Sequence, residues 1–136
     1  MKHDIVIVGG GLTGCEIAYD LVLQGKKPII VEMLDDLICA KGVCLANSSF
    51  LREMLAFKKV PVYLNTKLVE VLEDGVVVEN KDGKQTIKAD SVITCMGYHP
   101  NPLTEKAAHV HLIGDAKKVG NLRTVIWTAW DVAMKI

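Results

Sequence analysis

Three glycines near the amino terminus have the spacing that binds the pyrophosphate of a dinucleotide. Gly9, Gly11 and Gly14 follow the apolar run 5–8 and precede an amphipathic stretch. In such a turn the first glycine permits the bend, the second lets the backbone approach the phosphates, and the third lets helix and strand pack closely. The N–H groups at the start of the helix then face the phosphates. The sequence predicts a dinucleotide site here, and the alternative is a glycine-rich turn without a ligand. The residues assigned to the predicted site are Gly9, Gly10, Gly11, Leu12, Thr13 and Gly14.

An acidic residue follows the glycine motif by about 20 positions, at the end of the next apolar run. Glu32 closes the stretch 28–32, where a carboxylate accepts hydrogen bonds from both hydroxyls of an adenosine ribose and repels a 2′-phosphate. Met33 and the three residues after it supply no Arg or Lys for such a phosphate. We therefore expect NAD(H) in preference to NADP(H), with Glu32 and Met33 in the site. The alternative is a surface glutamate that ends a strand.

The composition indicates one globular domain without a nucleic-acid or membrane partner. A chain of 136 residues, 50% of them hydrophobic, is long enough for one core but too short for two full dinucleotide-binding domains. The net charge is zero and the basic residues are scattered, so no electrostatic footprint for nucleic acid or anionic lipid is visible. The first apolar run is too short for a signal peptide, and no window approaches a membrane span. We expect a cytoplasmic protein.

The residue patterns predict an α/β fold of the Rossmann-like, three-layer dinucleotide-binding type, with a parallel sheet and an antiparallel β-meander. Helices are expected at 12–24, 47–59 and 122–135, the second with Asn47, Ser48 and Ser49 as capping candidates. The parallel strands are expected at 5–8, 28–32, 61–64, 91–95 and 110–113. The meander is expected at 67–72, 76–79 and 85–89.

Three ordered motifs resemble those of flavoprotein reductases with two dinucleotide-binding domains. They are the glycine motif 9–16, the strand 92–97 followed by Pro100 and Asn101, and the segment 111–116. In that family the nicotinamide-binding domain is inserted into a flavin-binding domain. The resemblance implies an NAD(H)-binding domain at 1–102 and a trailing segment of an FAD-binding domain at 103–136.

The same resemblance implies further site residues. Cys95, Met96 and Gly97 belong to the motif at the return crossing, and Gly114 and Asp115 belong to a flavin site in the intact protein. Glu16 matches an acidic position near the nicotinamide half of the cofactor, and the alternative is a glutamate favoured by the helix dipole. The interval 98–113 is shorter than the family leads us to expect, which affects the placement of Asp115.

The carboxyl-terminal region, 114–130, is similar to that of the enoate reductases and dienoyl-CoA reductases related to old yellow enzyme. Those proteins carry an amino-terminal barrel with FMN and an iron–sulfur cluster, followed by a module that binds FAD and NAD(P)H. This sequence contains neither the barrel nor the first glycine motif of the flavin domain. The resemblance therefore implies an excised NADH-binding domain whose partners are NADH and the missing flavin and barrel domains. The resemblance also implies that this domain passes hydride from NADH to FAD for reduction of an activated alkene.

Two rival functions come from other classes. Cys39 and Cys44 have the four-residue spacing of the redox disulfide in glutathione-reductase-type enzymes, which would indicate a thiol–disulfide reductase. Their flanking residues differ from that motif, so two ordinary cysteines are the alternative. The other rival is a non-catalytic NAD-binding module. The sequence predicts no catalytic acid, base or nucleophile and no metal site.

Overall fold

The computed structural model describes residues 3–105 and 107–136. The chain forms two compact units, which divide between Met96 and Gly97 and are described separately below. The first unit holds a six-stranded sheet and two helices. The predicted ligand-binding domains, 1–102 and 103–136, remain a prediction.

The first three parallel strands and the two helices between them follow the order that the sequence predicts. The strands β1 (His3–Val8), β2 (Pro28–Val31) and β3 (Val62–Tyr63) alternate with the helices α1 (Leu12–Leu23) and α2 (Leu45–Phe57). β2 pairs with β1 on one side and with β3 on the other, all in parallel. Short apolar strands joined by helices give this arrangement because a parallel crossover needs a helix to cover the sheet.

The antiparallel meander consists of β4 (Lys67–Leu72), β5 (Gly75–Asn80) and β6 (Gly83–Thr94). β6 pairs with β5 in antiparallel fashion through its first half and with β1 in parallel through its second half. The sheet order is therefore β3-β2-β1-β6-β5-β4. The prediction of two strands, 85–89 and 91–95, was wrong, since one strand runs through both. Residues 84–94 contain no glycine or proline that would end it.

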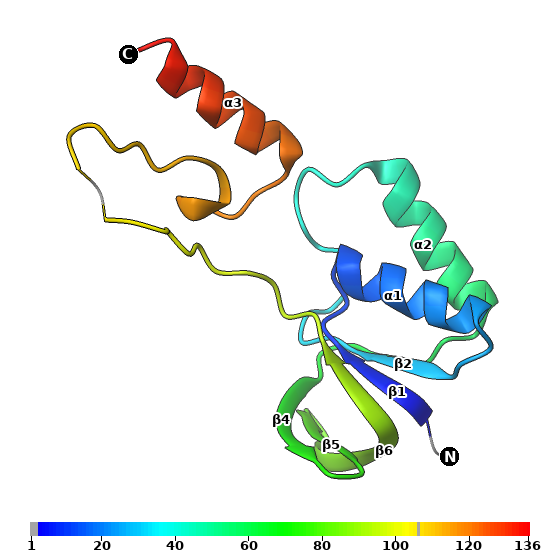
Figure 1. Cartoon of the computed structure of the whole chain (residues 1–136). Coiled ribbons are helices and arrows are strands. Elements are labelled where there is room, and N and C mark those ends of the chain that lie inside the picture. The colour runs from blue at the N-terminus through cyan, green and yellow to red at the C-terminus, as the bar shows by residue number, and fades with distance from the viewer. Residues whose placement is uncertain (1–2, 106) are drawn as a thin grey trace. The chain divides into compact units, whose positions relative to one another are not determined.

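Two apolar clusters cover the two faces of the parallel strands. Ile7 and Ile30 face α1 and α2, which lie together on one side of β1 and β2 (Figure 1). Val6 and Ile29, one position earlier on each strand, face the meander through Val76 and its neighbours. Because successive strand residues point to opposite faces, the continuous apolar runs of β1 and β2 fill both clusters. The predicted α/β, Rossmann-like fold with three layers is confirmed.

The start of α2 differs from the prediction. The helix begins at Leu45, with Cys44 as its N-cap residue, so Asn47, Ser48 and Ser49 lie inside the helix. Ser48 is buried, and its hydroxyl donates to the Leu45 carbonyl oxygen at 3.0 Å. A serine hydroxyl can bond to a backbone carbonyl inside the helix in this way, so a serine can lie within the first turn as well as at the N-cap. Serine residues therefore indicate the start of a helix only approximately.

The second unit contains a short helical turn, η1 (Gly114–Ala116), and the helix α3 (Leu122–Ala133). Asn121 caps α3 and forms a reciprocal capping box with Thr124. The predicted strand at 110–113 was wrong, because the described residues there form only an isolated bridge between Ala107 and Val110. An apolar run becomes a strand only where another strand pairs with it, and the described part of this unit offers none.

Candidate functional site

Two of the motif glycines are required by the fold itself. Gly9 has a φ of +110°, and a Cβ on it would lie 2.3 Å from the Cys95 carbonyl oxygen. A Cβ on Gly14 would lie 2.0 Å from the Gly9 carbonyl oxygen. The chain therefore excludes larger residues at both positions, whether or not a ligand binds.

Gly11 is different, because its backbone and surroundings would accept a side chain. Apart from the chain neighbours of Gly11, no atom of the described residues lies within 4 Å of a Cβ built on it, and its φ of −69° is ordinary. Gly11 is also the N-cap residue of α1, where no side chain caps the helix and the first turn holds no acidic residue. The first backbone N–H groups of a helix have no acceptor within it. Open space beside such N–H groups fits the pyrophosphate of a dinucleotide.

Glu32 lies at this turn, as the sequence predicts. The residue is 9% exposed. Its Oε2 accepts from the Gly10 N–H at 2.5 Å, and its Oε1 accepts from the Leu34 N–H at 2.8 Å. Each carboxylate oxygen retains a further lone pair. The side chain can therefore accept hydrogen bonds from ribose hydroxyls while it stays fixed to the turn. Met33, the next residue, is 66% exposed.

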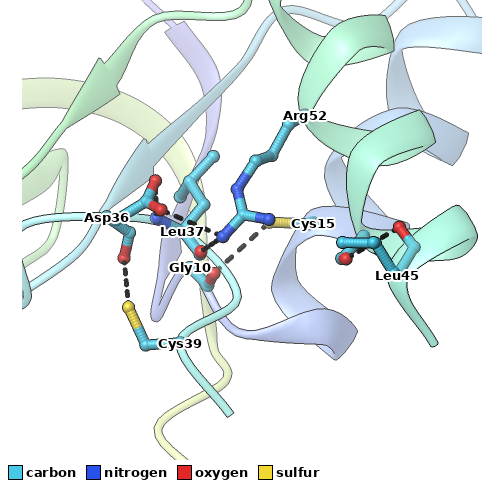
Figure 2. Close-up of polar contacts among 8 residues, drawn as sticks. Gly10, Cys15, Asp36, Leu37, Cys39, Leu45 and Arg52 are labelled. Carbon is cyan, nitrogen blue, oxygen red and sulfur yellow. Dashed lines mark hydrogen bonds and ion pairs between the residues drawn. The ribbon is translucent and has the colours of Figure 1, made fainter. Parts of the chain in front are cut away.

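The segment that follows β2 is held against the glycine turn by contacts that sequence reasoning missed. Arg52, on α2, donates through Nη2 to Asp36 Oδ2 at 3.0 Å and to the Leu37 carbonyl oxygen at 2.5 Å (Figure 2). The Ile38 N–H donates to the Gly10 carbonyl oxygen at 2.8 Å. Asp36 and Arg52 are 16 positions apart, and no spacing rule connects such residues.

The end of β6 supplies the other side of the turn. Cys95 follows β6, and its N–H donates to the Val8 carbonyl oxygen at 2.7 Å, so Cys95 and Met96 lie next to Gly9. In parallel sheets, ligands bind outside the carboxyl ends of the strands, where chain connections diverge to opposite sides. The carboxyl ends of β1 and β6 form such a point, because β2 lies on one side of β1 and β6 on the other. Glu16 lies on α1 with its side chain exposed.

The four cysteines are free thiols in different environments. Cys15 is fully buried behind the turn, where its Sγ donates to the Gly10 carbonyl oxygen at 3.4 Å. Burial raises the pKa of the Cys15 thiol to about 12 and also raises the pKa of Cys95, which is half-buried. Cys39 and Cys44 are exposed, and the Cys39 thiol donates to the Asp36 carbonyl oxygen at 3.2 Å.

The remaining predicted residues belong to the second unit. Gly97 is its first residue. The N–H of Gly114 donates to Thr128 Oγ1 at 3.2 Å, and Asp115 Oδ1 accepts from the Gly120 N–H at 3.0 Å. Asp115 thus closes a local turn with one carboxylate oxygen and leaves the other exposed. Its role towards a flavin stays a prediction.

Other kinds of site are not found in the described residues. Within 3–105 and 107–136, no three His, Cys, Asp or Glu side chains are grouped so that they could hold a metal ion. No helix in the same residues is long and apolar enough to cross a bilayer. A groove of about 220 Å³, lined in part by Lys26, Lys27, Lys58 and Lys59, lies at the amino-terminal ends of β1 and β2. This is the opposite end of the strands from the glycine turn.

Comparison with known proteins places these features in a family. Residues 1–133 match the family described as pyridine nucleotide-disulphide oxidoreductase. The chain is 36% identical to cinnamate reductase of Clostridium sporogenes over 142 residues, which cover 97% of this chain and 21% of that protein. It is 34% identical to NADH oxidase of Thermoanaerobacter brockii over 143 residues, which cover 98% of this chain and 21% of that protein.

A solved structure agrees in fold. The complex of 2-naphthoyl-CoA reductase with 2-naphthoyl-CoA matches with a TM-score of 0.81 at 24% identity, covering 100% of this chain and 21% of that chain. The chain thus spans about one fifth of the length of these relatives.

Proposed function

This chain belongs to the pyridine nucleotide-disulphide oxidoreductase family, and from that premise we propose that its first unit is the NAD(H)-binding domain of a flavoprotein oxidoreductase. The family consists of NAD(H)-dependent flavoproteins. The observation that carries the proposal is the open position beside Gly11, next to the buried carboxylate of Glu32. The fold itself does not require a glycine there, whereas a close-lying pyrophosphate does.

Each site residue has a physical role in this proposal. Gly11, Leu12 and Thr13 present backbone N–H groups to the pyrophosphate, and Glu32 accepts from the hydroxyls of the adenosine ribose. Gly9, Gly10 and Gly14 keep the turn tight enough for this approach, and Met33 lies beside the adenosine half. Glu16 lies near the nicotinamide half, as the resemblance implies, and Cys95 and Met96 border the turn at the end of β6. We propose no catalytic acid, base or nucleophile among the described residues.

Bound NADH supplies a hydride, which we propose is passed to FAD held elsewhere in the same polypeptide. The work of this unit is to bind and orient the nucleotide, because the redox chemistry belongs to the cofactors. Gly97, Gly114 and Asp115 belong, in this proposal, to the segment that completes the flavin site. FMN and an iron–sulfur cluster in a barrel domain are a further part of the proposal, which rests on the resemblance to enoate reductases.

The substrate we propose is an activated alkene conjugated to a carboxyl or thioester group. Cinnamate reductase, which this chain resembles at 36% identity, is named for an acid of this kind. The rival activity, thiol–disulfide reduction, would use Cys39 and Cys44, which are exposed and form no disulfide with each other in the structure. A Cys39→Ser variant of the whole protein decides between them: we expect NADH-dependent turnover to persist, and its loss would support the thiol–disulfide activity.

Calorimetric titration of the chain with NADH tests the binding proposal directly. A Gly11→Val variant should fold normally but bind at least about tenfold more weakly, because its side chain occupies the phosphate position. Ala46→Val is a matched control, since it makes a similar change at an exposed position in the first turn of α2. Absence of NADH binding by the folded wild-type chain, or equal binding by Gly11→Val, would contradict the proposal.

The non-catalytic alternative is tested at the level of the whole gene. Reading the open reading frame around this segment shows whether flavin and barrel domains accompany it. The complete protein should consume NADH when an enoate is present. A complete protein that binds NADH but has no flavin domain would instead be an NAD-binding module.

A further inference from the structure

The segment between β2 and α2 is packed tightly against the glycine turn. The side chain of Leu37 fills the space where Gly10 would carry a Cβ, with its Cδ2 atom 2.4 Å from that position. Ile38 is 5% exposed and has a φ of +52°. A positive φ is a genuine outlier for a β-branched residue, and it persists only where the surrounding structure enforces it.

Two contacts enforce this conformation from opposite sides. The Ile38 N–H donates to the Gly10 carbonyl oxygen at 2.8 Å, which ties the segment to the glycine turn. On the other side, Arg52 donates to the Asp36 carboxylate and to the Leu37 carbonyl oxygen, which ties the segment to α2. The Nε atom of Arg52 is buried and has no hydrogen-bond partner among the described residues. The guanidinium is thus partly desolvated and is held by these two acceptors.

Gly10 is the residue on which these contacts converge. Its carbonyl oxygen accepts from Ile38 and its N–H donates to Glu32 Oε2. The two peptide units that meet at Gly10 are therefore held separately, one by the carboxylate at the end of β2 and the other by the segment that Arg52 holds.

We propose that Arg52 is a positioning residue for the dinucleotide. By holding Asp36 and Leu37, it fixes Ile38 against Gly10 and so keeps Gly10 and Glu32 in the arrangement that meets the pyrophosphate and the adenosine ribose. This inference rests on the proposed function of the turn and adds to it a residue on α2 that does not touch the ligand itself.

The consequence of losing the guanidinium follows from the same contacts. Without it, the left-handed conformation of Ile38 has support on one side only, and the segment relaxes towards an ordinary backbone conformation. The Gly10 carbonyl oxygen then loses the N–H donor of Ile38, and the neighbouring peptide unit, whose N–H donates to Glu32, is held less firmly. The unit stays folded, because the cluster against the meander is untouched and Ile7, Ile30 and most of the other cluster lie outside this segment, but the nucleotide meets a less ordered site.

The experiment measures NADH binding by calorimetry with the full chain. Arg52→Met keeps the aliphatic stem and should weaken binding by about tenfold, and Arg52→Lys, which keeps one cation, should recover part of the loss. Lys88→Met is the matched control, since it removes a surface ion pair with Asp74 on the meander. We expect Lys88→Met to bind NADH as the wild type does.

A double-mutant cycle with Glu32→Gln separates positioning from a general loss of stability. If Arg52 acts through the carboxylate, Arg52→Met should have a much smaller effect in the Glu32→Gln background than in the wild type. The NMR resonance of the Gly10 amide should also shift in ligand-free Arg52→Met and stay in place in Lys88→Met. Should Arg52→Met fail to fold, Arg52→Lys and Asp36→Asn replace it in the same cycle.

The outcomes distinguish this inference from the proposed function. If the wild type binds NADH and the Arg52 variants bind it equally well, the positioning role is wrong and the proposed function stands. If the losses are simply additive with Glu32→Gln, the route through Glu32 is wrong. If the folded wild type does not bind NADH, the proposed function fails first.

Discussion

Replacement of Glu32 should change the choice between NADH and NADPH. The wild-type chain should bind NADH at least about tenfold more tightly than NADPH, a difference of about 1.4 kcal/mol. The buried Glu32 carboxylate would face a 2′-phosphate, and Asp35 and Asp36 add two exposed carboxylates to the same segment. Arg52 of α2, which contacts this segment, is already paired with Asp36.

The magnitude of the change can be worked from the two hydrogen bonds of Glu32. Its two oxygens accept from the N–H groups of Gly10 and Leu34. A glutamine can accept only one of these two hydrogen bonds, because its amide nitrogen is a donor. Glu32→Gln therefore leaves one N–H without an acceptor. This loss should lower the free energy of unfolding by about 1–3 kcal/mol. Glu32→Ala leaves both unsatisfied and also removes the ribose acceptor.

Calorimetric titration of both nucleotides into wild type, Glu32→Gln and Glu32→Ala measures the preference, and urea denaturation measures the stability. We expect Glu32→Ala to weaken NADH binding while NADPH binding changes little, so the gap between them narrows. Asp82→Ala is a suitable control, because it removes a carboxylate from an exposed turn of the meander. Equal or tighter NADPH binding by the wild type would refute the assignment of Glu32, as would an unchanged gap in Glu32→Ala.

Three further predictions concern the turn, the thiol behind it and the flavin. Gly14→Ala should lower the free energy of unfolding by about 1–3 kcal/mol, because the new Cβ would lie 2.0 Å from the Gly9 carbonyl oxygen. Urea denaturation measures this change. Unchanged stability would contradict the conclusion that the fold requires a glycine at this position. Folding raises the pKa of Cys15 from 9.0 to about 12, so its stabilising contribution is complete below pH 9 and is lost between pH 9 and 12. Denaturation across this range should show that loss in the wild type and not in Cys15→Ala. The purified chain should be colourless, and a yellow preparation with stoichiometric FAD would mean that the glycine turn binds flavin.

The parts of the fold that follow from local patterns could be predicted from the sequence. The runs in β1 and β2 are apolar at every position, which indicates strands buried on both faces, and the glycine motif between β1 and α1 fixes the turn. Gly11 and Glu32 could be predicted as site residues because the motif specifies their spacing. These features depend on residues that are close in sequence or on a motif whose geometry is known.

The parts that depend on tertiary pairing could not be predicted. Whether 85–89 and 91–95 are one strand or two depends on β6 having β5 beside its first half and β1 beside its second half. The contact between Arg52 and Asp36 leaves no trace in periodicity, and the positive φ of Ile38 contradicts the preference of a β-branched residue. A sequence pattern reports what each segment prefers, and these features exist only where the assembled structure overrides that preference.

The glycine motif contains two glycines that the fold requires and one whose presence indicates a ligand. Gly9 and Gly14 are required by contacts within the protein, so a turn that bound nothing would need them as much as a turn that binds NADH. Gly11 has no such requirement, and its value as a sign of a ligand comes from the empty space beside it. Because the ligand interpretation rests mainly on this one glycine, substitutions at Gly11 and Gly14 should separate binding from folding. Gly11→Val should lose affinity while stability is kept, and Gly14→Ala should lose stability in the absence of any nucleotide.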